Sequence, residues 1–253
     1  HAVNRRAMSP PFFRHPSKFG VITLRPSKRH GTLTYEQKGG NQSTVDADGV
    51  SLDAYIHALY GFALQRPGRR VLMIGCGGGT LATMLARAGK RVTAVDIDPV
   101  SFRLAKRYFG LPPEVECHVG DGLDYLRKVR RKFDILIVDA FIGKYMPTHM
   151  KGQVLGEAAR RVLAEDGAIL INICLHKKID PTADRMAEGF AAAGWPVRLL
   201  DSPGAERNAI VLAGAVKGLR RPALTLPPAA RTGWTRRNLK VMRFRKWKRA
   251  KRP

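Results

Sequence analysis

A short apolar run that leads directly into a glycine-rich loop constrains the fold of this chain more than any other feature. Residues 71–74 are Val-Leu-Met-Ile, and residues 75–80 read Gly-Cys-Gly-Gly-Gly-Thr. An uninterrupted apolar run is typical of a parallel strand that is buried on both faces. Glycines after such a strand let the backbone turn sharply into a helix and let a ligand approach the main chain. The segment therefore predicts a strand–loop–helix unit with a ligand at its turn.

Strand and helix patterns alternate through the central part of the chain. Further apolar strand patterns occur at residues 92–95, 115–119, 135–138 and 168–173, with helical spacing between them. This alternation predicts an α/β fold with a doubly wound, Rossmann-like and mostly parallel sheet. Ligands of such sheets bind beyond the carboxyl ends of the strands.

A smaller unit precedes this sheet. Residues 20–26 and 31–36 are short strand-like runs joined by a polar turn, and residues 42–46 add a third. They predict a small N-terminal antiparallel β piece. Apolar residues at helical spacing then predict a helix over 52–65.

Basic residues gather at the end of the chain. The whole sequence has 45 Lys and Arg against 20 Asp and Glu, a net charge of +25, and residues 217–253 contain 14 of the basic residues and no acid. Trp and Phe rings interleave with them, and such a segment can neutralise phosphates and stack on bases. This basic C-terminal tail is the part that would contact nucleic acid. The alternatives are rings that pack on the body, or a solvated, partly disordered tail.

Cysteine usage and hydropathy exclude several classes of protein. Cys76, Cys117 and Cys174 stand far apart without a Cys-x-x-Cys pair, so we expect no metal site, no disulfide framework and a reducing, cytoplasmic location. No apolar run approaches the roughly 18 to 20 residues of a membrane span. Thr80 stands where a dinucleotide fingerprint has its last glycine, and no Gly-Lys-Ser/Thr follows the loop as a P-loop requires.

Acidic residues end three of the predicted strands. Asp96 lies about 20 residues after the glycine loop, where a carboxylate accepts hydrogen bonds from ribose hydroxyls. Asp121 stands between two glycines and is placed either to accept from an adenine amino group or to cap the next helix. Asp139 ends an apolar strand, where an unpaired carboxylate is costly without a role. The three acids predict a nucleoside site at one edge of the sheet.

These motifs as a set resemble the spermidine synthase-like aminopropyltransferases, within the class I S-adenosylmethionine-dependent transferase fold. The resemblance runs from about residue 39 to 213 and rests on the glycine loop, Val95–Asp98, Gly120–Gly122 and Phe133–Phe141. It implies that Asp139 is the catalytic acidic residue, whose carboxylate helps to deprotonate the attacking amine. It also implies that the chain forms a homodimer. The cofactor-binding residues that it implies, with the glycine loop, are Gln42 near the sulfonium or the methionine-derived part, Gly75, Gly77, Gly79, Asp96 at the ribose, and Asp121 and Gly122 at the adenine.

Three departures from the family pattern bear on the substrate. Gly78 replaces a loop acid that holds the amine of decarboxylated S-adenosylmethionine, Ile142 replaces a second acid, and Ser51 replaces a tyrosine, although Asp53 retains an acid nearby. These losses and the net charge argue against putrescine unless the field in the pocket is locally inverted. With the loop acid gone, the Gly78 and Gly79 amides are expected to receive the carboxylate of intact S-adenosylmethionine.

Three functions are consistent with these residues. The first is a spermidine synthase-like transferase that moves an aminopropyl or related group from a sulfonium nucleoside to an amine, with Asp139 as base. The second is an S-adenosylmethionine-dependent methyltransferase that acts on a small molecule or RNA. The third is a non-catalytic nucleoside- or nucleic-acid-binding protein. The predicted parts of the chain are a basic segment at 1–19, a small β domain at 20–50, a Rossmann-like catalytic domain at 51–216 and the basic tail at 217–253.

Overall fold

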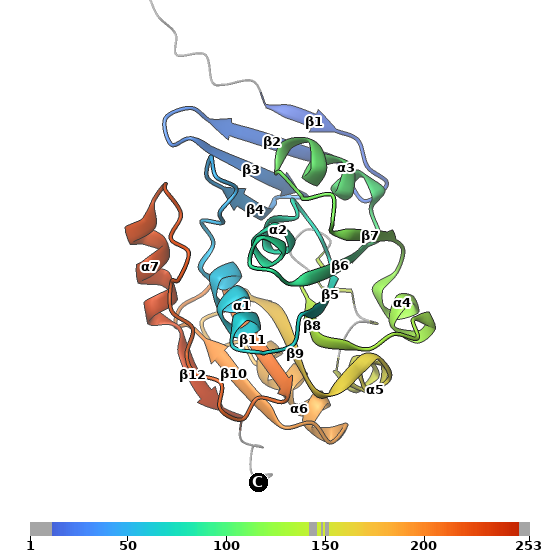
Figure 1. Cartoon of the computed structure of the whole chain (residues 1–253). Coiled ribbons are helices and arrows are strands. Elements are labelled where there is room, and N and C mark those ends of the chain that lie inside the picture. Colours follow the sequence, from blue (N-terminus) through green and yellow to red (C-terminus); the bar gives the residue numbers. More distant parts are fainter. Residues whose placement is uncertain (1–11, 142–145, 148, 150–151, 248–253) are drawn as a thin grey trace, which may run out of the picture.

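Two sheets organise the chain in the computed structural model, which describes residues 12–141, 146–147, 149 and 152–247 (Figure 1). The smaller sheet is antiparallel, in the order β1-β2-β3-β4. Its strands are β1 (Phe13–His15), β2 (Ile22–Ser27), β3 (Thr32–Gln37) and β4 (Gly40–Val45). The predicted N-terminal β piece is confirmed, with β1 as an additional strand.

The larger sheet has the order β12-β10-β11-β9-β8-β5-β6-β7. Strands β5 to β9 pair in parallel, whereas β11, β10 and β12 are antiparallel to their neighbours. The strands are β5 (Arg70–Ile74), β6 (Arg91–Asp96), β7 (Glu116–Val119), β8 (Phe133–Val138), β9 (Leu163–Leu175), β10 (Val197–Asp201), β11 (Arg207–Gly214) and β12 (Arg243–Lys246). The predicted α/β fold with a mostly parallel sheet is therefore confirmed.

Helices cover both faces of this sheet because successive side chains of each buried strand point to opposite sides. Val71 and Met73 of β5 face the layer of α1, α2, α3 and α7, whereas Leu72 and Ile74 face α4, α5 and α6. The helices are α1 (Ala54–Leu64), α2 (Thr80–Arg87), α3 (Pro99–Tyr108), α4 (Gly122–Lys128), α5 (Gly152–Val162), α6 (Thr182–Ala192) and α7 (Thr232–Val241). None of the described helices is long and apolar enough to span a membrane.

The sheet reverses its winding at β5, which lies between β6 and β8. Gly75 follows β5 at this point with a φ of +92°, and a Cβ there would lie 2.1 Å from the carbonyl oxygen of Asp139. Only glycine allows this approach. The ends of β5 and β8 consequently meet where open α/β sheets bind their ligands.

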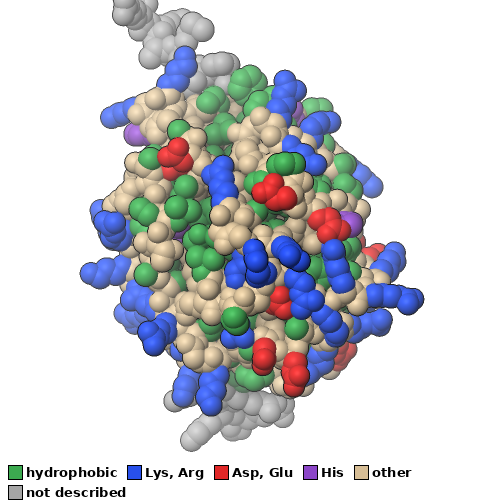
Figure 2. Space-filling model, viewed as in Figure 1, with side chains coloured by type: hydrophobic (Ala, Val, Ile, Leu, Met, Phe, Trp, Pro, Cys, Tyr) green, Lys and Arg blue, Asp and Glu red, His purple; other side chains and the backbone are tan. Residues whose placement is uncertain are grey.

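The C-terminal segment is part of the fold as far as residue 247. Helix α7 packs on α1, and the Thr235 hydroxyl donates to the carbonyl of Leu52 at 2.7 Å. Strand β12 pairs with β10, and its Phe244 ring lies 5.2 Å from that of Phe62 between ring centroids. Among the alternatives for this segment, packing on the body is therefore correct for Phe244. Lys and Arg side chains are spread over the visible face (Figure 2), while contact with nucleic acid and the division at residue 217 stay predictions.

Candidate active site

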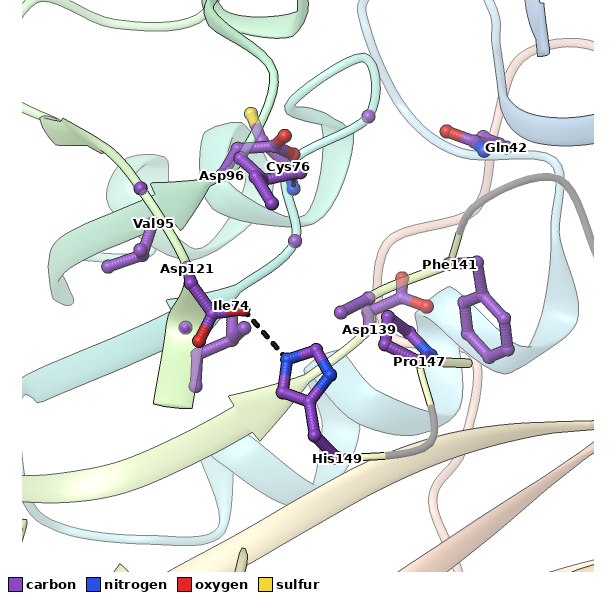
Figure 3. A pocket seen from close by; sticks show the side chains of 16 residues that line it. Gln42, Ile74, Cys76, Val95, Asp96, Asp121, Asp139, Phe141, Pro147 and His149 are labelled. Carbon is purple, nitrogen blue, oxygen red and sulfur yellow. Dashed lines mark hydrogen bonds and ion pairs between the residues drawn. The ribbon is translucent and has the colours of Figure 1, made fainter. Parts of the chain in front are cut away.

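Two adjoining chambers open at the carboxyl ends of the parallel strands, and Gln42, Cys76, Gly77, Asp139 and Phe141 line both. The remaining residues of the first chamber are Ile74, Gly75, Val95, Asp96, Ile97, Gly120, Asp121, Gly122, Ala140, Pro147 and His149 (Figure 3). The remaining residues of the second chamber are Asn41, Ser43, Asp53, Tyr55, Ile56, Met73, Thr80, Leu81, Asn172, Cys174 and Asn208.

Asp96 lies at the end of β6 and is held by the backbone on either side. Its carboxylate accepts hydrogen bonds from the amides of Cys76 at 2.7 Å and Asp98 at 2.8 Å. Burial raises the pKa of Asp96 above its ordinary value, and these amides oppose that rise. The glycine loop and the end of β6 are thus joined through one carboxylate in the wall of the first chamber. Asp98, by contrast, caps α3 by accepting from the Val100 amide.

Asp121 both caps a helix and faces the first chamber. Its Oδ1 accepts from the amides of Leu123 and Asp124 at the start of α4, and His149 lies 2.7 Å from its Oδ2. Figure 3 shows this contact as a dashed line. Burial alone would raise the pKa of Asp121, but the Asp124 amide and His149 outweigh it and lower the pKa. The sequence analysis missed His149, which comes from a segment without a recognisable pattern.

The glycine loop does not present free amides to a carboxylate. The Gly78 amide donates to Ser43 Oγ at 3.0 Å, and the Gly79 amide donates to the carbonyl of Cys76 at 2.8 Å. The expectation that these two amides bind a carboxylate is therefore wrong, because both are already satisfied. Gly79 is the N-cap of α2 and lines neither chamber, whereas Gly75 and Gly77 line the first.

Gln42 stands where the two chambers meet and carries an unsatisfied polar group. Its Nε2 is buried and has no hydrogen-bond partner among the described residues. Figure 3 shows its side chain well apart from Asp121 and Asp96. A buried donor without a partner costs free energy unless a ligand satisfies it. Gln42 and the Asp96 carboxylate thus lie at separate places in the wall of one chamber.

Asp139 lies at the boundary of the two chambers, one residue after β8. Asn172 of β9 donates to its Oδ1 from Nδ2 at 2.8 Å. Burial raises the pKa of Asp139 to about 6, although the Asn172 hydrogen bond opposes the rise. The carboxyl group can therefore exchange a proton close to neutral pH.

Two further residues bring polar groups into the second chamber from the start of α1. Burial raises the pKa of Asp53 to about 6, opposed by the Thr44 amide and assisted by the charge of Asp139. Burial and the charges of Asp139 and Asp53 raise the pKa of Tyr55 well above its usual range. The sequence analysis noted Asp53 but did not single out Tyr55, which belongs to the helix predicted over 52–65.

Other residues singled out in the sequence lie elsewhere. Ser51 is fully buried, and its hydroxyl accepts from the Asp53 amide, so it shapes the start of α1 and lines neither chamber. Ile142 is outside the described residues. No cluster of three or more His, Cys, Asp or Glu side chains suited to a metal ion occurs in the part of the chain that the structure describes.

Comparisons of sequence point to transferases. A methyltransferase domain model matches residues 71–167. A polyamine aminopropyltransferase from Vibrio vulnificus is 31% identical over 121 residues, which cover 45% of this chain and 40% of that protein. A second, from Chromobacterium violaceum, is 30% identical over 139 residues, or 52% of this chain and 53% of that protein. The chain thus spans about half the length of these curated relatives.

Comparison of structures extends the likeness to nearly the whole chain. A probable spermidine synthase from Corynebacterium glutamicum superimposes with a TM-score of 0.77 at 17% identity, covering 94% of this chain and 91% of that one. At this identity the match shows a common fold. Together, the comparisons confirm that the chain resembles the spermidine synthase-like aminopropyltransferases and carries the class I S-adenosylmethionine-dependent transferase fold.

Proposed function

We propose that the chain binds a sulfonium nucleoside, S-adenosylmethionine or its decarboxylated form, in the first chamber and transfers an aminopropyl or related group to an amine in the second. The observation that carries this proposal is the position of Asp139, which lines both chambers. A group at that boundary can act on an acceptor while the donor is bound next to it.

The first chamber offers one partner for each part of a nucleoside. Asp96 accepts from the ribose hydroxyls, Asp121 and Gly122 lie at the adenine, and Gln42 meets the chain attached to sulfur. When bound, the nucleoside supplies a carbon activated by the positively charged sulfur. These assignments agree with the positions of the residues around the chamber.

The second chamber suits a cation despite the strong positive charge of the chain. Its described lining includes Asp53 and Asp139 and contains no Lys, Arg or His. The ionisable groups Asp53 and Asp139 of this lining thus carry charge opposite in sign to the net charge of +25. This inversion answers the objection that a basic protein repels amines, and it supports an amine as acceptor.

Asp139 is the proposed base because an ammonium group has no lone pair with which to attack. The carboxylate takes one proton from the ammonium, and the freed lone pair forms a bond to the carbon beside the sulfur. The carbon–sulfur bond breaks, and its electron pair remains on sulfur as a neutral thioether. Asn172 holds one oxygen of Asp139 throughout, while Asp53 favours the cationic acceptor before the proton leaves.

Methyl transfer is the second candidate, and two observations favour it. Gly78 leaves the loop without the acid that would hold an ammonium group of decarboxylated S-adenosylmethionine. The unpartnered Nε2 of Gln42 is a donor, which suits the carboxylate of intact S-adenosylmethionine. The same chambers would then serve a methyl acceptor.

Titration calorimetry tests both candidates. S-adenosylmethionine, its decarboxylated form and methylthioadenosine are titrated into the protein and into Asp96→Ala. We expect all three to bind, with affinity reduced about 10- to 100-fold by the substitution, since hydrogen bonds to a charged group are lost. Tighter binding of the decarboxylated form supports aminopropyl transfer, and tighter binding of the intact form supports methyl transfer. If none of the three binds, both candidates are wrong.

A further inference from the structure

A pair of asparagines lies behind Asp139 on the rigid sheet. Asn172 of β9 donates from Nδ2 to Asp139 Oδ1 at 2.8 Å, and its Oδ1 accepts from Nδ2 of Asn208 in β11 at 2.9 Å. In the antiparallel register Asn208 is opposite Cys174 and Asn172 is opposite Ile210. The two asparagines are therefore diagonal neighbours on one face of the sheet, close enough for side-chain contact.

The direction of the Asn172 amide decides what Asp139 meets. An asparagine presents an acceptor oxygen at one end and a donor nitrogen at the other. If the Asn172 amide were reversed, its oxygen would face the carboxylate of Asp139, and its nitrogen would face the donor nitrogen of Asn208. Both contacts would then be repulsive. Because Asn172 is 1% exposed, water cannot readily repair them.

We propose that Asn208 is a positioning residue that fixes the direction of the Asn172 amide, so that Asn172 holds Oδ1 of Asp139 and leaves Oδ2 for the acceptor. This inference rests on the proposed role of Asp139. Asn208 itself lines the second chamber and not the first, so its influence on the nucleoside is indirect. Its Nδ2 also lies 3.6 Å from Cys174 Sγ, which helps to hold its own amide in place.

The test is a cycle of nearly isosteric variants, Asn208→Leu, Asn172→Leu and the double variant. The readout is the titration of Asp139, followed by NMR of carboxyl carbons in protein labelled at aspartate, with Asp139→Asn identifying the signal. Asp53 and Tyr55, which face Asp139 from the α1 side, remain unchanged in every member of the cycle. Asn41→Leu is the matched control, because Asn41 lines the second chamber but has no part in the asparagine pair.

We expect Asn172→Leu to move the Asp139 titration upward by about one pH unit, the equivalent of one hydrogen bond to a charged group. Asn208→Leu should move it in the same direction by a smaller amount. The double variant should match Asn172→Leu alone, since Asn208 acts only through Asn172. Asn41→Leu should leave the titration where it is.

Two results would overturn the proposal: a wild-type titration in Asn208→Leu, or a double variant whose shift equals the sum of the single shifts. Urea unfolding checks that each variant folds, and Asn208→Ser replaces Asn208→Leu if it does not. The NMR measurement needs no turnover. A protein that transfers nothing but shows the expected cycle would therefore disprove the function and leave the asparagine pair established.

Discussion

Asp53 and Asp139 line the same chamber although they belong to different elements. The negative charge of Asp139 adds to burial in raising the pKa of Asp53 to about 6. One acid precedes α1 and the other follows β8. Two carboxyl groups that disfavour each other's ionisation hold less than two negative charges near pH 6. A bound ammonium group would remove this conflict, which supports the proposed amine acceptor.

Removal of the Asp139 carboxylate should slow transfer strongly while changing nucleoside binding little. In Asp139→Asn the amide cannot accept a proton from the acceptor, and we expect the rate to fall by about 10²- to 10⁴-fold, the usual contribution of a general base. Methylthioadenosine affinity, measured by calorimetry, should change little. A rate within a few-fold of wild type would show that Asp139 is not the base.

The rate of transfer should follow the ionisation of Asp139. Burial raises the pKa of this carboxyl to about 6, so the base is protonated and inactive below that pH. At saturating donor and low acceptor concentration, the rate should rise with pH up to about 6 and increase more slowly above it. A profile that stays flat between pH 5 and 7 contradicts this assignment.

Asp53 should cost the folded protein stability at neutral pH. Burial raises its pKa from 3.8 to about 6, so the native state holds the proton more tightly than the unfolded state does. Stability from this group is therefore complete below about pH 4 and is lost as the pH rises through about 6. Asp53→Asn should raise the free energy of unfolding at pH 7.5 by on the order of 1 kcal/mol and change it little at pH 4.

Urea unfolding of the wild type and of Asp53→Asn at pH 4 and pH 7.5 measures this difference in stability. The Thr44 amide, which donates to the Asp53 carboxylate at 3.3 Å, can still donate to the asparagine oxygen. Ser43→Ala is a control from the same region that adds and removes no ionisable group. Equal stability changes at pH 4 and pH 7.5 would show that burial does not raise the pKa of Asp53.

His149 should compete with an adenine amino group for Asp121. The imidazole lies 2.7 Å from Oδ2, while Oδ1 is already bound to two amides of α4. In His149→Ala this oxygen becomes available, and we expect methylthioadenosine to bind several-fold more tightly. The inosine analogue, which lacks the amino group, should show no gain. Weaker binding of methylthioadenosine in the variant would mean that His149 contacts the nucleoside directly.

Phe244 should contribute to the stability of the whole domain, although it belongs to the basic segment. Its ring packs against Phe62, and the Arg198 guanidinium lies 3.5 Å from its centroid. Phe244→Ala should lower the free energy of unfolding by about 2 kcal/mol, less than for a fully buried phenylalanine. Trp234→Ala is the control, because Trp234 is 41% exposed and should change stability by less than about 0.5 kcal/mol.

The sheet could be predicted because each buried strand is a continuous apolar run, as in Val71–Ile74, with a helical pattern after it. Strand β12 could not, because its alternating Arg-Phe-Arg-Lys sequence becomes a strand only through pairing with β10. Helix α7 was hidden in the same way. It buries only Thr235 and Leu239, and its other positions are mostly polar or basic, with Trp234 and Val241 exposed.

Asp96, Asp121 and Asp139 could be predicted because each stands at or just after the end of a parallel strand, where the topology brings them together. Gln42 followed from the family resemblance. Tyr55 and Asn208 escaped notice, since a tyrosine in an apolar helix and an asparagine at a strand end look ordinary until the fold places them. Neutral side chains that act through the direction of a hydrogen bond leave no pattern in the sequence.

The position of β12 at the edge of the large sheet has a consequence for strand pairing while the chain folds. All the strands around the site are synthesised before β12, and until it arrives the outer edge of β10 is open to pairing with another chain. Once β12 is in place, the new edge carries Arg243 and Lys246, while Arg245 pairs with Asp184. Like charges on the edges of two copies repel each other, so we expect the basic strand to oppose pairing between copies, sheet to sheet.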